Sequence, residues 1–239
     1  MLALKLLVIF VTFCLFGSVK CEKKICDFAD SKCLTETSAP LFDEFVVGMP
    51  GVPPSDPLHL DSFEINQPSI KYAITDANLS RFKNCAVETV RINAKDMKYD
   101  YQIGCPHLTL QSGYEIKGNI GDQSVEGKGT STTDFYDYHL LFDGDFSSRN
   151  GENGTVYLHL VNHNLKIVVK GNVKYDYKNL FDGDKQKSDA FLKFVNENWQ
   201  IMDKTINEPV INAFMNIYID NVNAYLNIVP VQRLFSYEA

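Results

Sequence analysis

The spacing of apolar residues predicts one long helix near the C-terminus. Between residues 183 and 229, apolar side chains recur every three or four positions, which is the period of an amphipathic helix. Before Pro209 the opposite face is polar, and Asp182, Asp184 or Ser188 can supply the N-terminal cap. Beyond Pro209, apolar residues cover most of the circumference and leave a thin line of Asn and Asp. We therefore expect this second half to be enclosed by the rest of the chain.

Prolines predict where this helix bends and ends. Pro209 has no backbone N–H to donate and crowds the preceding turn, so we expect a kink or a short break there. Pro230 predicts that the helix ends at or before Val229. A membrane span is a poor interpretation, because no run of about 18–20 residues within the segment lacks Asn and Asp. The polar face expected before Pro209 consists of Asp189, Lys193, Asn196, Glu197, Gln200, Asp203, Lys204, Asn207 and Glu208.

Between Ile70 and Tyr177 the apolar period is two, which is typical of strands with one buried face. The alternation changes parity at Asp96, and this change predicts a β-bulge inside one strand. Gly- and Asn-rich pairs separate the segments and predict an antiparallel meander. Strands of about 12 residues would each reach roughly 40 Å. Turns are predicted at residues 121–122, 127–129, 143–145, 150–151 and 153–154.

A one-faced sheet and an enclosed helix each need an apolar partner, so the predicted fold class is α+β. We expect a long C-terminal helix wrapped by a curved, highly bent antiparallel β-sheet. Upstream, the pattern of residues 27–47 predicts a short helical segment, and Pro40 limits its regularity. Residues 48–57 are expected to form a proline-rich connector. With 45% hydrophobic and 22% charged residues, the composition fits a globular chain.

The first 21 residues read as a secretory signal peptide. An apolar run from Leu2 to Phe16 is too short for a membrane span, and we place cleavage after Cys21, with Ser18 as the rival site. Residues 22–239 then form one secreted, extracellular domain. The net charge of −7 becomes −9, because the segment contains two lysines and no acid. An acidic surface argues against nucleic acid or anionic lipid as a partner.

Four cysteines, Cys26, Cys33, Cys85 and Cys105, remain after this cleavage. An even number in an oxidising compartment predicts disulfides, with three connectivities open. The short loop favours Cys26–Cys33, and the other two lie in neighbouring strand-like stretches. A zinc site is the competing interpretation, but there is no Cys-x-x-Cys in the chain. Two glycosylation sequons begin at Asn78 and Asn153.

Sequence signatures of catalysis are missing. The chain has no Gly-x-Ser-x-Gly elbow, phosphate-binding loop, dinucleotide fingerprint or His-Glu-x-x-His motif. His159 and His163 share the spacing of one strand face, but two solvent-facing histidines explain them better than a metal site. Asp143-Gly144-Asp145 resembles the start of a calcium loop, yet Ser148 stands where that loop needs Gly. We expect no enzyme activity, no cofactor and no metal.

Taken together, several stretches resemble the insect juvenile-hormone-binding and takeout family, part of the tubular lipid-binding superfamily. Each stretch is weak alone, but the combination spans the whole mature chain. A Cys85–Cys105 disulfide would depart from the usual family pattern, because Cys105 is not typical of that pattern. The residues that carry the resemblance are Cys26 and Cys33, Gly48 to Leu58, Ile103 to Leu110 with Tyr114 and Gly118, Leu180 to Asp184, Phe194 to Trp199, Pro209, and Pro230 with Leu234 and Phe235.

The resemblance implies an internal hydrophobic tunnel that holds a lipophilic ligand. The ligand classes would be a juvenile hormone, another terpenoid, a fatty acid or a quinone, carried by a monomer without stable membrane insertion. The alternative hypothesis is a secreted interaction protein with a packed core and a protein partner. We expect the tunnel wall to consist of Phe191, Phe194, Val195, Met202, Ile206, Val210, Ala213, Phe214 and Ile217 on the helix, and of Tyr99, Tyr101, Tyr136 and Tyr138 on the strands.

Overall fold

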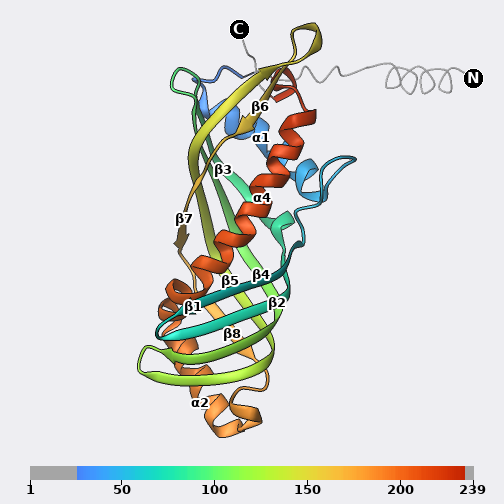
Figure 1. Ribbon diagram of the computed structural model, residues 1–239. Coiled ribbons are helices and arrows are strands. Elements are labelled where there is room, and N and C mark those ends of the chain that lie inside the picture. The colour runs from blue at the N-terminus through green and yellow to red at the C-terminus, as the bar shows by residue number, and fades with distance from the viewer. Residues whose placement is uncertain (1–25, 235–239) are drawn as a thin grey trace, which may run out of the picture.

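The computed structural model describes residues 26–234, and its dominant element is an eight-stranded antiparallel sheet (Figure 1). The strand order is β1-β2-β4-β5-β6; β3 also pairs with β4, and β7 and β8 pair with β5. The predicted signal peptide lies outside the described residues. The strands are β1 (Leu58–Gln67), β2 (Ile70–Ser80), β3 (Ala86–Asn93), β4 (Lys98–Ile120), β5 (Gln123–Asn150), β6 (Val156–Leu160), β7 (Asn164–Val169) and β8 (Val173–Tyr177).

The sheet bends around the C-terminal helices, as the α+β prediction required (Figure 1). Its two central strands, β4 and β5, have 23 and 28 residues, about twice the predicted length. The helical elements are α1 (Ser31–Val47), η1 (Phe82–Asn84), η2 (Glu152–Gly154), η3 (Phe181–Gly183), α2 (Lys185–Glu197), α3 (Trp199–Met202), the π-helical turn η4 (Asp203–Asn207), α4 (Glu208–Ile228) and α5 (Val231–Leu234).

Some strand predictions were wrong, and their errors have physical causes. The parity change at Asp96 is a hairpin turn between two strands, β3 and β4, with Met97 at φ 54°. Residues 127–129 and 143–145 do not form turns but lie inside β5. There glycine permits close approach, because a Cβ on Gly129 or Gly144 would lie 2.2 Å from a neighbouring carbonyl oxygen. Strand β1 was not predicted.

The C-terminal helix is interrupted twice. The π-helical turn η4 ends just before Glu208 and Pro209, so the break expected at this proline is confirmed. A second break, at Asn198 between α2 and α3, was not predicted. At the start, the Asp184 side chain accepts a hydrogen bond from the Lys187 backbone N–H, so it is one of the predicted caps. The long helix ends at Ile228, ahead of Pro230.

Most of α4 is enclosed. Its exposed residues are Glu208, Asn212, Asn216, Asp220, Asn227 and Ile228, and the prediction of an enclosed second half is confirmed. The polar face expected before Pro209 is only partly exposed, because Asp203 and Asn207 are 7% and 3% exposed. Both residues lie in η4, where the π-helical turn changes the phase of the helix relative to the sheet.

Amide side chains from the helices cover two free edges of the sheet. Asn223 on α4 accepts from the Leu160 N–H at 2.8 Å and donates to its carbonyl at 3.1 Å. Asn196 on α2 makes the same pair of contacts with Tyr175, at 2.8 and 3.0 Å. Because edge strands carry unpaired backbone groups, these contacts both satisfy them and fix the helix against the sheet.

Both predicted disulfides are formed. Cys26–Cys33 joins the chain ahead of α1 to its first turn, with Cα atoms 5.5 Å apart. Cys85–Cys105 joins the residue before β3 to β4, with Cα atoms 4.2 Å apart. Within residues 26–234 no helix is long and apolar enough to cross a membrane. No group of His, Cys, Asp and Glu in this part of the chain could hold a metal ion.

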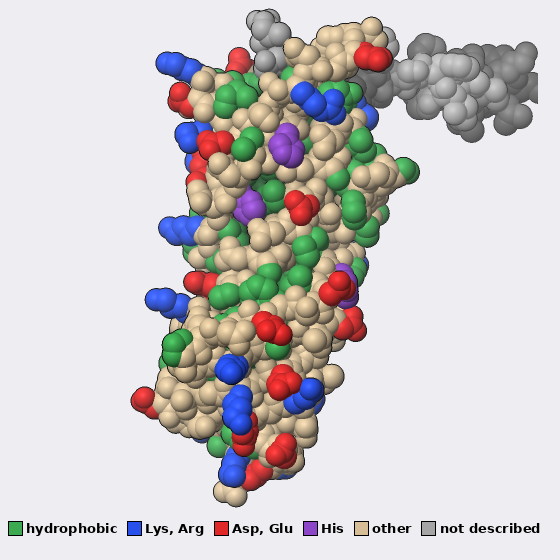
Figure 2. All heavy atoms as spheres, viewed as in Figure 1, with side chains coloured by type: hydrophobic (Ala, Val, Ile, Leu, Met, Phe, Trp, Pro, Cys, Tyr) green, Lys and Arg blue, Asp and Glu red, His purple; other side chains and the backbone are tan. Residues whose placement is uncertain are grey.

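Charged side chains are spread unevenly over the surface. On the face shown in Figure 2, acidic and basic side chains mix at the lower end, whereas hydrophobic side chains show through in the middle. Several ion pairs lie at the surface, such as Lys185–Asp189 and Lys193–Glu197. Exposed pairs of this kind contribute little stability, so they indicate a solvated surface.

Candidate functional site

A cavity of about 160 Å³ lies at the end of the molecule that carries α1. We call this region, formed by α1, β3, β6 and the C-terminal half of α4, the α1 end; it is the upper part of Figure 1. The cavity lies between these elements and the neighbouring parts of β4, β5 and α5. It is lined by Ser38, Leu41, Phe42, Phe45, Val90, Ile92, Tyr99, Asp100, Tyr101, Phe146, Leu158, Leu160, Tyr218, Ile219, Val222, Tyr225, Leu226 and Leu234.

The lining is apolar and aromatic. Phe45 packs edge-on against Tyr218 and Tyr225, with ring centroids 5.5 and 5.8 Å apart. Asp100 is the one charged residue among the lining residues, and none of them is a cation. Such a surface can hold a lipophilic molecule, whereas a polar or charged one would lose its hydration without new partners.

Four tyrosines line this cavity, Tyr99, Tyr101, Tyr218 and Tyr225, and hydrogen bonds are formed by the hydroxyls of the first three. The Tyr99 hydroxyl donates to the Asn162 carbonyl at 3.1 Å, so its hydrogen is already used. The hydroxyl oxygens of Tyr101 and Tyr218 lie 3.1 Å apart and hydrogen-bond to each other. Burial raises the pKa of Tyr99 to about 12 and the pKa values of Tyr101 and Tyr218 further, so all three remain protonated at physiological pH.

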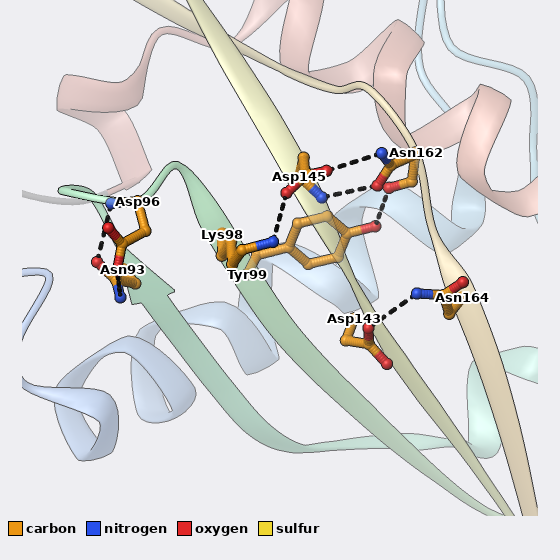
Figure 3. A network of polar contacts seen from close by, with 8 residues as sticks. All are labelled: Asn93, Asp96, Lys98, Tyr99, Asp143, Asp145, Asn162 and Asn164. Atoms are coloured by element: carbon orange, nitrogen blue, oxygen red, sulfur yellow. Dashed lines mark hydrogen bonds and ion pairs between the residues drawn. The ribbon is translucent and has the colours of Figure 1, made fainter.

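A polar network on the outer side holds Tyr99 in place (Figure 3). Asn162 accepts from the Asp145 backbone N–H at 2.9 Å, and its amide donates to the Asp145 carboxylate at 2.8 Å. Lys98 pairs with the same carboxylate at 2.9 Å, and these contacts lower the pKa of Asp145. The network fixes the carbonyl that Tyr99 binds, so it positions one wall of the cavity.

Two of the thirteen residues expected in the tunnel wall, Tyr99 and Tyr101, line the cavity. The structure places the other eleven outside it. Tyr136 lies on the outer face, stacked on His107 with centroids 4.5 Å apart, because the strand parity of β5 changes at Asp137, where φ is 53°. Ala213 on α4 is partly exposed. The rest contribute to the core or pack against it: Phe191, Phe194, Val195, Met202, Ile206, Val210, Phe214, Ile217 and Tyr138.

Sequence reasoning missed the contribution of α1. Leu41, Phe42 and Phe45 of this helix line the cavity, together with residues of β6. The available signal was the continuation of the apolar surface of α4 past Ile217, through Val222, to the C-terminus. An enclosed helix segment requires a cover, and α1 supplies part of it.

The opposite end of the molecule is filled by a buried polar network. We call this region, formed by β8, α2, α3 and η4, the α2 end (Figure 1). Tyr138 donates to the Asp203 carboxylate. Asn207 donates to Asp203 at 3.1 Å and to the Tyr175 hydroxyl at 2.6 Å. Burial raises the pKa of the Asp203 carboxyl, although both hydrogen bonds to it act in the opposite direction.

A second hollow, of about 590 Å³, lies beside β8. Its lining includes Asp134, Lys174, Asp176 and Glu197, so it is polar and charged. Asn196 also lines this hollow, but its side-chain amide already hydrogen-bonds to the backbone of Tyr175 on β8. This composition does not suit a lipophilic ligand, and the apolar cavity at the α1 end is the better candidate site.

Comparisons with known proteins agree with this geometry. A sequence profile of the family described as haemolymph juvenile hormone binding protein matches residues 6–236. The circadian clock-controlled protein daywake of Drosophila melanogaster is 24% identical over 228 residues, covering 90% of this chain and 87% of that protein. Daywake of Drosophila yakuba is 24% identical over 211 residues, covering 81% of each chain.

A solved structure has the same fold. The crystal structure of Takeout 1 from Epiphyas postvittana superposes with a TM-score of 0.84 at 23% sequence identity. The match covers 89% of this chain and 99% of that one. The wrapped helix and the curved sheet are therefore shared, while a sequence identity this low carries the fold alone.

Proposed function

The chain belongs to the haemolymph juvenile hormone binding protein family, and we propose that it is a secreted carrier of a lipophilic small molecule bound at the α1 end. The observation that carries the proposal is the apolar cavity between α1 and the C-terminal half of α4. The ligand classes considered are a juvenile hormone, another terpenoid, a fatty acid or a quinone. The eleven predicted wall residues outside the cavity are not included in this site.

The size of the cavity limits how such a ligand is held. Engineered apolar cavities of about 150 Å³ bind benzene, whereas pockets for drug-sized ligands measure roughly 300–1,000 Å³. The cavity of about 160 Å³ is therefore smaller than a fifteen-carbon ligand needs. We infer that the cavity widens when a ligand binds, because the lining side chains of α1 and α5 move away from α4.

The proposal that the protein is secreted rests on its disulfides and on the pattern of its N-terminal residues, and not on the cavity. The two disulfides fit an oxidising compartment, and residues 1–21 have the pattern of a signal peptide. Asn153 is exposed in the loop before β6, where a glycan can be accommodated, and Asn78 is partly exposed on β2. The carrier is proposed to be a single-domain monomer whose surface does not bind nucleic acid.

The test is displacement of a fluorescent apolar probe by terpenoid, fatty-acid and quinone ligands, supported by native mass spectrometry of the purified protein. Val222→Trp fills the cavity from α4 and should weaken uptake at least about tenfold. The matched control is Ile201→Trp, because Ile201 is 38% exposed and lies outside the cavity. Equal uptake by both variants, or no uptake by the wild type at micromolar concentration, would favour the interaction-protein hypothesis.

A further inference from the structure

The polar hollow beside β8 has the size of a second small-molecule site. Its volume of about 590 Å³ lies within the range of roughly 300–1,000 Å³ that small-molecule pockets have. Residues of β5 and β8 line it on one side, and residues around the break between α2 and α3 line it on the other. It shares no lining residue with the apolar cavity at the α1 end. A ligand in this hollow would therefore be separate from the lipophilic ligand.

An aromatic side chain lies among the polar residues of this hollow. Trp199, the only tryptophan of the chain, lines it and is partly exposed. The helix break at Asn198 starts α3 at this residue, and the Tyr175 hydroxyl donates to the Trp199 carbonyl at 3.4 Å. The backbone of Trp199 is thereby held against β8. An indole ring at this position offers a flat apolar surface to one face of a ring-shaped ligand.

Two polar side chains of the lining remain available to a ligand. Thr132 lies on β5 and Asn172 lies directly before β8. Within residues 26–234, neither side chain forms a hydrogen bond with another residue. A hydroxyl and a carboxamide together supply both donors and acceptors. They suit a ligand that also carries both, as a hydroxyl group does.

The charges around the hollow balance one another. Its charged lining residues are Asp134, Lys174, Asp176 and Glu197. Lys178 pairs with Asp176 at 2.7 Å. Lys193 lies 3.9 Å from Glu197. Three carboxylates therefore face three lysines, so neither an anion nor a cation finds an uncompensated partner, whereas a neutral polar ligand can use the carboxylate oxygens as acceptors.

We propose that the hollow beside β8 binds a neutral saccharide. One face of a sugar ring packs on Trp199, and its hydroxyl groups bind Thr132, Asn172 and the carboxylates of the lining. The proposal is independent of the carrier function, because the two sites have separate linings. A free sugar and the sugar units of a glycan present the same hydroxylated ring, so both sources are tested.

The single tryptophan makes the test direct. The full-length protein is titrated with maltose as a free sugar, with diacetylchitobiose as the core of a glycan, and with maltose 1-phosphate as the charged counterpart. Tryptophan fluorescence and calorimetry are recorded together. We expect at least one neutral disaccharide to bind with a dissociation constant below about 1 mM, and the phosphate to bind at least about fivefold weaker than maltose if maltose is the one that binds. The proposal is overturned if neither neutral disaccharide binds up to about 10 mM, or if the phosphate binds as well as the neutral sugar.

Substitutions in the lining assign the binding to this hollow. Thr132→Val combined with Asn172→Ala removes both free polar groups and keeps the hydrogen bond from the Tyr136 N–H to the residue 172 carbonyl, and it should weaken saccharide binding at least about fivefold. Trp199→Phe should weaken it about two- to tenfold, measured by calorimetry. The control is Gln200→Ala, because Gln200 is the exposed neighbour of Trp199 outside the lining.

Two outcomes would contradict the assignment. Unchanged affinity in the strand variant, with a melting temperature near that of the wild type, places the saccharide elsewhere, and this variant decides the matter even if Trp199→Phe does not fold. Saturating saccharide should leave the uptake of an apolar probe unchanged, since the probe occupies the α1 end. Displacement of that probe by the saccharide would show that the two sites are not separate.

Discussion

The α1 end and the α2 end pack around the same helical segment, yet the first holds an apolar cavity, whereas the second has a buried polar network inside and a polar, charged hollow beside β8. At the α1 end, the helix faces apolar and aromatic side chains around a cavity of about 160 Å³. At the α2 end, Asp203 and Asn207 face Tyr138 and Tyr175 in a closed hydrogen-bond network. The attachment of helix to sheet is alike at both ends, since Asn223 and Asn196 cover strand edges in the same way.

The contrast between the two ends follows from how apolar contacts and buried hydrogen bonds respond to a change of partner. Apolar contacts are non-directional, so any apolar group of suitable volume can pack against an apolar wall, and a ligand can do so as well as a side chain. Hydrogen bonds in a buried network have fixed partners and lengths, and a missing partner leaves an unsatisfied group. The polar network therefore fixes the α2 end, while the α1 end retains the freedom to open around a guest.

The largest effect is expected when a carboxylate enters the enclosed helix without partners. Phe214 is completely buried on α4 between the two ends, so Phe214→Asp should cost more than about 4 kcal/mol or prevent folding. Asp203 shows the contrast, because its burial is matched by Tyr138 and Asn207. The measurement is secretion yield and chemical denaturation.

Lys204→Asp is the control for this substitution. Lys204 is exposed although it directly follows the buried Asp203 in η4, so the change should alter stability by less than about 0.5 kcal/mol. If the Lys204 and Phe214 variants lose similar stability, the helix is not enclosed as the structure indicates.

Added volume should separate the two ends by an intermediate amount. Val195 is completely buried in the filled region, and Val195→Trp should lower the free energy of unfolding by about 3 kcal/mol through overpacking. Val222→Trp adds the same volume beside the cavity and should cost less than about 1 kcal/mol. Thermal unfolding of the two ligand-free variants measures both, and a reversed order would show that the hollow is not at the α1 end.

The smallest expected effect is a pH dependence confined to the α2 end. Burial raises the pKa of Asp203 above its unfolded value, so the folded state binds this proton more tightly. The resulting stabilisation is fully present below the unfolded pKa, and it declines as pH rises through the folded pKa. Asp203→Asn cannot ionise, so its stability relative to the wild type should increase between pH 4 and pH 7.

Denaturant unfolding at several pH values tests this trend. Asp189→Asn is the control, because Asp189 is exposed on α2 and pairs with Lys185 at the surface. A constant difference between the wild type and Asp203→Asn over this range would mean that burial does not favour the protonated carboxyl.

The sequence by itself determined the architecture, because the fold depends on periodicities that single residues carry. A period of two predicted the sheet, and the helical period with its loss of a polar face beyond Pro209 predicted an enclosed helix. Proline chemistry predicted the break before α4 and its end before Pro230. The positions of the four cysteines along the chain left three connectivities open but favoured the pairing that the structure shows.

Tertiary structure alone decided where the interior is hollow. An apolar residue that faces a cavity and one that faces a packed neighbour have the same sequence pattern, so Phe191 and Val195 could not be distinguished from Val222 and Tyr225. The phase of the helix also changed at η4, which turned Asp203 and Asn207 inward. The change of strand parity at Asp137 turned Tyr136 outward. The apolar period predicts which face of a helix or strand a residue lies on. The register between elements then decides which residues or which cavity that face contacts.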